Sequence, residues 1–158
     1  MTIKTTNSAM LARLLLAASL SVTATSVIAA NMEMHKSAQC GCCTEWGDIM
    51  AEKGHNVSVI EQQNMTQIKQ QVGLLPGLQS CHTVKVSNAT GHEYIIEGHV
   101  PEADILKLLA QQPESVVGLA APGMPRFSPG MAQPGEPYQG FDVIAWDKTG
   151  KQWVFSQY

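Results

Sequence analysis

The sequence predicts an α/β domain with the element order β-α-β-α-β-β-α and a C-terminal loop and hairpin extension. Three observations support this class. Apolar residues recur at helical spacing in three segments, β-branched or alternating runs lie between them, and glycines and prolines separate the segments. A chain of 158 residues has the usual size of one domain.

Residues 1–30 are predicted to be a bacterial secretory signal peptide. Lys4 and Arg13 precede an uncharged apolar stretch from Leu14 to Ile28, and two alanines follow it. The stretch is shorter than the roughly 20 residues of a membrane-spanning helix, although a retained anchor is the alternative. We therefore expect residues 31–158 to form a single periplasmic domain with no stable membrane insertion after cleavage.

The first half of the domain is predicted to contain two strands, each followed by a helix. Trp46, Ile49 and Met50 fall at i, i+3 and i+4, which is one helix face. Asn64 can cap the second helix, with Gln67 in the third position as in a capping box. The four elements, in chain order, are expected at Met32–Lys36, Cys43–Lys53, Val57–Ile60 and 65–72.

The second half is predicted to contain a hairpin, a helix, a loop and a final hairpin. Pro101 suits the first turn of the helix. Two Pro-Gly-Met units, at 122–124 and 129–131, indicate loop structure. The expected elements are strands at Val84–Val86 and Tyr94–Ile96 about a turn at 88–91, a helix from Pro101 that stops before Pro113, and strands at Phe141–Trp146 and Gln152–Phe155.

Cysteines cluster between the first strand and the first helix. Cys40, Cys42 and Cys43 lie within four residues, and Cys81 is the only other cysteine. Cys40 and Cys43 form a C-x-x-C pair within a predicted βαβ unit, which suggests a thioredoxin-like fold. In that fold the cysteine loop lies at the N-terminus of the first helix, where free N–H groups and the helix dipole favour thiolates.

The segment before the third predicted strand favours metal binding. In thioredoxins this loop lies against the cysteines and carries a cis-proline, whereas here it is Gln79-Ser80-Cys81-His82. Four thiolates suit Cu(I), zinc or iron–sulfur clusters. Adjacent Cys42 and Cys43 fit bridged Cu(I) ions better than one tetrahedral zinc ion. We therefore expect one or more Cu(I) ions bound by these two cysteines with Cys40 and Cys81.

Two other uses of the cysteines remain open. In a thiol–disulfide oxidoreductase, Cys40 would be the attacking thiol and Cys43 the resolving thiol. In an exported protein the four cysteines can also form two structural disulfides. A chain of this size does not need such bridges, however, and Cys42 beside Cys43 is poorly placed to link distant segments.

Histidines and methionines supply further candidate ligands. His99 lies beside Gly98, where a strand gives way to a helix, and loops at such positions often carry function. His82 can ligate only if the backbone at Cys81 is irregular, because neighbouring residues of a strand face opposite sides. Thioethers from Met124 or Met131 would add to a copper site.

Other polar residues are expected to face solvent. His35 and His55 are predicted to be solvent-facing histidines, and Glu97 a solvated residue of the hairpin. The whole chain has a formal net charge of −3. The predicted leader holds two of its ten basic and none of its 13 acidic residues, which leaves a net charge of −5. This balance argues against nucleic acid as a partner.

Several separated motifs together resemble the CopG family of exported bacterial proteins associated with copper resistance. The motifs are Cys40-Gly41-Cys42-Cys43 with Trp46, Ser80-Cys81-His82-Thr83, Glu97-Gly98-His99-Val100-Pro101 and Gly118 to Pro125. The resemblance extends from about His35 to Tyr158. Members often carry a proline two residues before the first cysteine, where this chain has Ala38.

The resemblance implies a function as well as a fold. It implies a thioredoxin-like domain in the periplasm that binds copper through Cys40, Cys42, Cys43 and Cys81, with His99 and Met124 as the best further ligands. Other periplasmic copper-resistance proteins are the implied partners. Because the site is rich in thiolates on a redox scaffold, it is also expected to interconvert Cu(I) and Cu(II), with cysteine pairs, Cys40 and Cys43 foremost, as electron reservoirs.

Overall fold

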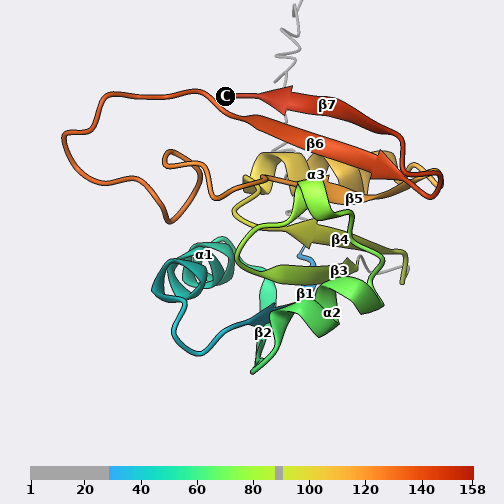
Figure 1. Cartoon of the computed structure of the whole chain (residues 1–158), viewed down its shortest axis with the longest axis horizontal. Coiled ribbons are helices and arrows are strands. Elements are labelled where there is room, and N and C mark those ends of the chain that lie inside the picture. The colour runs from blue at the N-terminus through green and yellow to red at the C-terminus, as the bar shows by residue number, and fades with distance from the viewer. Residues whose placement is uncertain (1–28, 88–90) are drawn as a thin grey trace, which may run out of the picture.

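The computed structural model describes residues 29–87 and 91–158, so all of the predicted leader except residues 29 and 30 lies outside the described part. The described elements follow the expected order, with one added strand (Figure 1). They are β1 (Asn31–Lys36), α1 (Gly41–Glu52), β2 (Asn56–Glu61), α2 (Met65–Gln71), a 3₁₀ turn (Pro76–Leu78), β3 (Thr83–Ser87), β4 (Glu93–Glu97), α3 (Glu102–Gln111), β5 (Val116–Ala120), β6 (Asp142–Asp147) and β7 (Gln152–Gln157).

The described strands form one mixed sheet in the order β2-β1-β3-β4-β5-β6-β7. Strand β1 is parallel to β2 and antiparallel to β3, and β3 is antiparallel to β4. This arrangement of the first four strands is that of a thioredoxin-like core. The predicted α/β class and core are therefore confirmed.

Strand β5 joins the predicted C-terminal hairpin to that core. It runs parallel to β4, with Ile95 opposite Gly118, and antiparallel to β6. The sequence pattern predicted no strand there, because the segment is a five-residue apolar run and gives no periodicity of its own. Its Gly118 is required by close packing, since a Cβ there would lie 2.0 Å from the Ile95 carbonyl oxygen.

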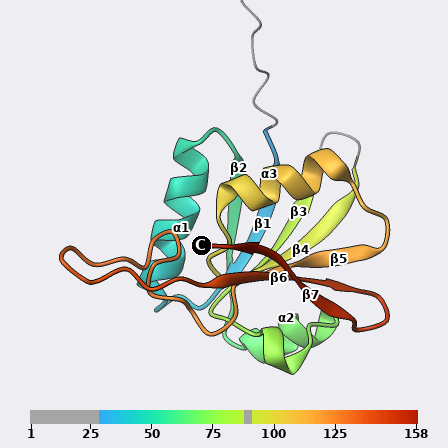
Figure 2. The ribbon, with the colours of Figure 1, turned by 90° about the horizontal axis from the view of Figure 1, so that it is seen from above.

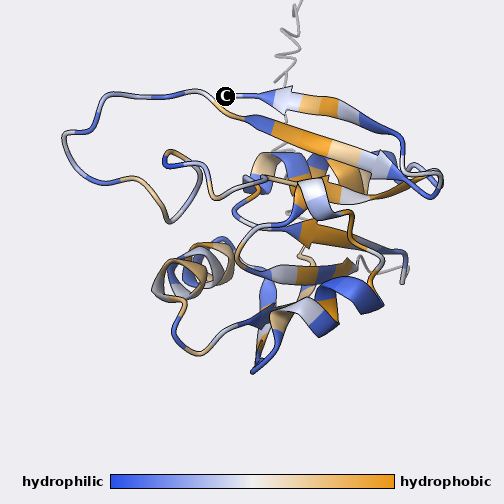
Figure 3. Cartoon of the chain, in the orientation of Figure 1, coloured by the Kyte–Doolittle hydropathy of each residue, from blue (hydrophilic) through white to orange (hydrophobic). Residues whose placement is uncertain are grey.

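Helices cover both faces of the sheet. Helices α1 and α3 lie on one face and α2 on the other (Figure 2). The larger core lies beneath α1 and α3, and a smaller one, which includes Leu78, Ile95 and Trp146, lies on the α2 side. Apolar residues concentrate in β4 and β6, whereas α2 is mostly hydrophilic (Figure 3). The described helices include none long and apolar enough to cross a membrane.

The helix termini follow the sequence signals. The Asn64 side chain accepts hydrogen bonds from the backbone N–H groups of Thr66 and Gln67 at 3.1 and 3.4 Å, which confirms the predicted cap. Pro101 directly precedes α3. Helix α1 begins two residues earlier than predicted, at Gly41, so that Cys42 and Cys43 both belong to its first turn.

The prediction that His35 and His55 face solvent is wrong. Both are buried, and each has at least one hydrogen-bond partner that is remote in sequence. The His55 Nδ1 accepts from the Ala30 backbone N–H at 3.2 Å, and its Nε2 lies 3.2 Å from the Glu102 carboxylate. His35 lies between Glu33 and Gln62. Burial is tolerated because these partners satisfy the ring nitrogens.

Candidate metal centre

The cysteine motif forms the start of α1. Cys40 is the N-cap residue, with an extended backbone at φ −82° and ψ 92°. Cys43 is fully buried and packs in the same apolar cluster as Trp46, whereas Cys40 and Cys42 are half-buried. The motif therefore places one sulfur in the core and two near the surface at the positive end of the helix dipole.

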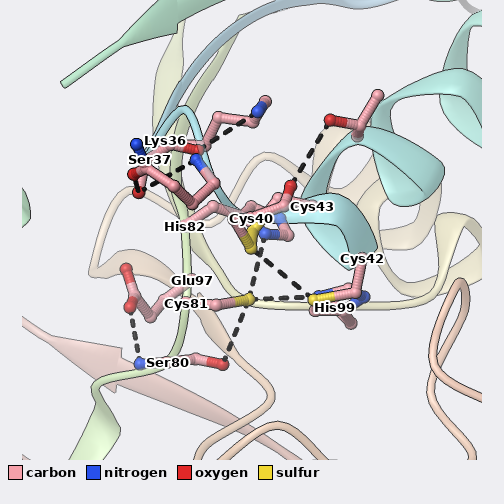
Figure 4. The surroundings of a disulfide bond; sticks show 12 residues. Lys36, Ser37, Cys40, Cys42, Cys43, Ser80, Cys81, His82, Glu97 and His99 are labelled. Carbon is pink, nitrogen blue, oxygen red and sulfur yellow. Dashed lines mark hydrogen bonds between the residues drawn. A yellow bond between two sulfur atoms is a disulfide. The ribbon is translucent and has the colours of Figure 1, made fainter.

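Cys81 approaches this helix terminus from the segment that precedes β3. One ligand atom from each of the four cysteines lies within 4.8 Å of the others. Figure 4 shows Cys81 directed toward the cysteines of α1, from a loop forty residues away in the sequence. Cys81 thus lies beside the C-x-C-C motif, as predicted.

The four sulfurs are in two chemical states in this structure. Cys40 and Cys43 are joined by a disulfide with their Cα atoms 5.3 Å apart, while Cys42 and Cys81 are free thiols. The Cys42 Sγ lies 3.6 Å from the Cys40 Sγ. Both thiols therefore lie beside a disulfide that can open to supply two more.

A buried ion pair that was not predicted from the sequence holds the Cys81 segment in place. Glu97 was predicted to be solvated, but it is fully buried and pairs with Lys69 of α2. Its carboxylate also accepts hydrogen bonds from the Ser80 backbone N–H at 2.7 Å and the Thr83 hydroxyl at 2.6 Å. Residues on both sides of Cys81 are thereby fixed to the end of β4. The only signal in the sequence was an acidic residue directly after three apolar ones.

His99 faces Cys81 from the other side. Its Nε2 lies 3.1 Å from the Cys81 Sγ, and its Nδ1 lies 2.7 Å from the Pro129 carbonyl oxygen. Since a carbonyl can only accept, the Nδ1 carries the hydrogen and the Nε2 of the neutral ring presents its lone pair to Cys81. Burial lowers the pKa of His99, and the bond to Pro129 opposes that shift.

His82 lies on the same side as Cys81, because the backbone bends at Cys81 before β3 begins. Its Nδ1 is 3.3 Å from the Cys81 Sγ, and its ring contacts those of Trp46 and His99 at centroid distances of 4.8 and 4.9 Å. Burial, reinforced by the charge of His99, holds the pKa of His82 well below its usual range. The irregular backbone that ligation by His82 requires is thus present.

The Cys81 thiol holds its proton at neutral pH in the metal-free protein. Burial raises its pKa to about 11, and the charge of Cys42 adds to the shift, while a hydrogen bond from Ser80 opposes it. A metal ion that binds this sulfur must therefore displace a proton.

The loop that contains the second Pro-Gly-Met unit, residues 129–131, packs beside the site. Gly130 packs against α1 so closely that a Cβ would lie 3.1 Å from the Trp46 backbone nitrogen. Met131 is half-buried beside it, whereas 44% of Met124 is exposed, at a backbone φ of 55°. Cys42 lines a surface pocket of about 530 Å³ between α1 and this loop, which offers a route for exchange with solvent.

The chain is similar to known proteins in sequence and in fold. The family described as "Protein of unknown function, DUF411" matches residues 78–131, which include Cys81 and His99. A solved structure described as "Copper resistance protein copG- Form 2" is 33% identical, with a TM-score of 0.72, over 82% of this chain and 98% of its own. The chain belongs to the CopG family. The Form 1 structure is 32% identical, also with a TM-score of 0.72, and the match covers 84% of this chain and 98% of that one. No curated protein matches the chain.

Membership of the CopG family accounts for the whole described architecture. The likeness covers nearly the full length of both solved CopG structures, so the C-terminal extension belongs to the shared fold as much as the thioredoxin-like core. The family identified from separated sequence motifs is therefore confirmed.

Proposed function

We propose that this CopG-family protein binds Cu(I) through Cys40, Cys42, Cys43 and Cys81 in the periplasm and serves copper resistance. The observation that carries the proposal is the convergence of the four sulfur atoms within 4.8 Å, one of them from a remote loop. Soft thiolates favour Cu(I), and adjacent Cys42 and Cys43 favour bridging between ions. The names of the two similar solved structures support copper as the cargo.

The site is also proposed to exchange electrons with copper. The disulfide between Cys40 and Cys43 must accept two electrons before all four sulfurs can bind metal. In the reverse direction, two thiolates form one disulfide and release two electrons, which reduce two Cu(II) ions to two Cu(I) ions. Copper binding and cysteine oxidation are therefore coupled at the same atoms.

His99 and Met124 are proposed as supporting ligands, with His82 and Met131 as weaker candidates. Support is strongest for His99, whose Nε2 lone pair faces Cys81 at 3.1 Å. The exposed Met124 side chain would have to turn inward to join. The leader predicted at residues 1–30 is the reason for proposing export to the periplasm, where other copper-resistance proteins are the proposed partners.

Metal analysis tests this function. Reduced protein is exposed without oxygen to equal amounts of Cu(I) and Zn(II), desalted and assayed for both metals and for free thiols. We expect bound copper in stoichiometric amount and protection of all four thiols. Stoichiometric zinc without copper would contradict the proposal.

A thiol–disulfide oxidoreductase is the second candidate, favoured by the Cys40–Cys43 disulfide at a helix N-terminus. Reduction of insulin disulfides distinguishes the two functions. An oxidoreductase loses this activity in Cys40→Ser and is indifferent to copper. A copper-binding protein has little insulin-reductase activity. Copper suppresses this residual activity, because the metal occupies the attacking thiolate.

A further inference from the structure

Cys81, His82 and His99 form a second set of metal ligands that does not depend on the Cys40–Cys43 disulfide. We infer that these three residues hold one divalent transition-metal ion while Cys40 and Cys43 are bridged. The inference rests on the proposed function, because Cys81 serves both the four-cysteine site and this one, and His99 and His82 are also proposed as supporting ligands of the four-cysteine site. The two sites are therefore occupied in alternation, according to the state of the disulfide.

The spacing of the three ligand atoms suits a single ion. The Cys81 Sγ lies 3.1 Å from the His99 Nε2 and 3.3 Å from the His82 Nδ1. A tetrahedral zinc ion, with its usual bond lengths to sulfur and nitrogen, holds such atoms about 3.5 Å apart. Each sulfur–nitrogen distance differs from this value by less than half an ångström, and one ligand atom from each of the three residues lies within 4.8 Å of the others.

His99 is already oriented as a ligand. Its Nδ1–H donates to the Pro129 carbonyl, so the ring cannot rotate without losing that bond, and its Nε2 lone pair is directed at Cys81. Ligating histidines in metal sites usually have such a partner on the second nitrogen. The loop that carries Pro129 thereby acts as the outer support of the site.

The metal-free cluster can satisfy the Cys81 sulfur but not the whole His82 ring. Cys81 has one thiol proton for the His99 Nε2, and a His82 Nδ1–H can donate to the same sulfur. His82 is fully buried, and its Nε2 has no hydrogen-bond partner among the described residues. An unpartnered buried polar atom is costly, by about 1–3 kcal/mol. A cation held by the sulfur, the His99 Nε2 and the His82 Nδ1 would replace the two weak sulfur contacts with coordinate bonds.

The ligand chemistry selects a divalent ion. Two neutral imidazoles and one thiolate are a borderline set that suits Zn(II), Co(II) or Cu(II), whereas four thiolates suit Cu(I). Binding releases the Cys81 proton to solvent. When a thiol reductant supplies the two electrons and two protons that open the Cys40–Cys43 bridge, the thiolate set recruits Cys81 instead. Oxidation of the pair thus changes the kind of ion that the protein retains.

Cobalt(II) is a suitable probe because its spectrum reports sulfur ligation. Oxidised protein, with the Cys40–Cys43 bridge verified by mass spectrometry of an unreduced digest, is titrated with Co(II) without oxygen. We expect one Co(II) per chain and a thiolate-to-cobalt charge-transfer band. His82→Gln and His99→Gln should each weaken binding by at least about 100-fold, beyond the roughly 10- to 100-fold effect of a lost outer-shell contact.

Matched variants identify the ligands. Cys81→Ser, which barely changes the side-chain size, should abolish the charge-transfer band with an unchanged circular dichroism spectrum. His92 lies outside the cluster, so His92→Gln should bind Co(II) as wild type does. The inference is overturned if wild-type protein shows no charge-transfer band, or if both histidine variants and Cys81→Ser retain wild-type affinity.

A parallel titration separates this inference from the proposed function. Reduced wild-type protein is titrated with Cu(I) under the same conditions. Cu(I) binding that survives His82→Gln, together with Co(II) binding that does not, supports two alternating sites. If reduced protein fails to bind Cu(I) but oxidised protein binds Co(II), the proposed function fails and the inference stands. The reverse pattern overturns only the inference.

Discussion

The Glu97 carboxylate accepts a hydrogen bond from the backbone N–H of Ser80 at 2.7 Å, which fixes the residue before Cys81 to the end of β4. The same carboxylate pairs with Lys69 inside the protein. A loop that must present a thiol to a helix forty residues away is therefore held by a buried charge pair. The Lys69–Glu97 pair is not part of the proposed ligand set, but it fixes the position of the loop that carries Cys81.

Glu97→Gln should loosen the Cys81 loop. The substitution keeps the side-chain shape but leaves the Lys69 ammonium buried without its partner, which typically costs about 3–5 kcal/mol. We expect urea unfolding to show a loss of this size, and alkylation of Cys81 in the folded protein to be at least about tenfold faster. Peptide mapping by mass spectrometry measures the second quantity.

Glu93→Gln is the matched control, because Glu93 lies on the same strand and is exposed. It should change neither stability nor alkylation. The double variant Lys69→Met with Glu97→Gln should lose less than the two single variants together, since it leaves no unpaired charge. Glu97→Gln protein with wild-type stability and wild-type Cys81 reactivity would show that the pair does not position the loop.

Gly98→Ala should damage the site more than Gly123→Ala does. Both glycines have positive φ, 72° and 70°, so both alanines incur the same kind of backbone cost, about 1–2 kcal/mol. Only at Gly98 does the added Cβ collide, at 2.4 Å from the Ser80 Oγ and 2.9 Å from the Ala121 carbonyl oxygen. At Gly123 nothing lies within 4 Å.

We expect Gly98→Ala to lower the free energy of unfolding by about 1–3 kcal/mol more than Gly123→Ala, the usual range for an overpacked position. Because the collision is with the residue next to Cys81, Gly98→Ala should also weaken Cu(I) binding. Denaturant titration and competition with a Cu(I) chelator measure the two effects. Equal losses in the two variants would mean that the Ser80 contact has no role.

Tyr158 should titrate unusually late. Burial, followed by the hydrogen bond to Asp104, raises the pKa of this phenol from 10 to about 12. Since the folded state holds the phenolic proton more tightly, the stabilisation is complete below about pH 10 and is lost as the pH rises through about 12. Absorbance titration of the phenolate should show a step near pH 12.

That step should disappear in Tyr158→Phe and move to lower pH in Asp104→Asn, which removes the carboxylate. Tyr158→Phe removes only the bond from the phenol, because the Ser156 hydroxyl still donates to the same Asp104 oxygen at 2.5 Å and keeps β7 tied to α3. A step that is unchanged in Tyr158→Phe would assign the late titration to another tyrosine.

Local signals predicted the core of the fold. Trp46, Ile49 and Met50 marked one face of α1, Asn64 marked the start of α2, and the C-x-x-C pair placed the cysteines at a helix terminus. Each of these signals is read within a few residues, so tertiary contacts are not needed to interpret them. The approach of Cys81 to the helix also followed, but only once the fold itself had been inferred.

Residues whose environment depends on remote partners were predicted wrongly. Glu97 and His55 have the local sequence context of surface residues. They are nevertheless buried, because Glu97 pairs with Lys69 and His55 contacts Glu102, and both partners are remote in sequence. Strand β5 was missed for a related reason, since its five residues become a strand through pairing with β4 and β6. Sequence periodicity carries no information about such contacts.

The proposed four-cysteine copper site is tested by titrating reduced protein with Cu(I) in competition with a chelator. The titration is made for wild type and for each single cysteine-to-serine variant. We expect tight binding by wild type and a large loss of affinity or of bound copper in all four variants, Cys81→Ser included. Wild-type Cu(I) affinity and stoichiometry in Cys81→Ser would contradict a four-cysteine site built from the helix terminus and the remote loop.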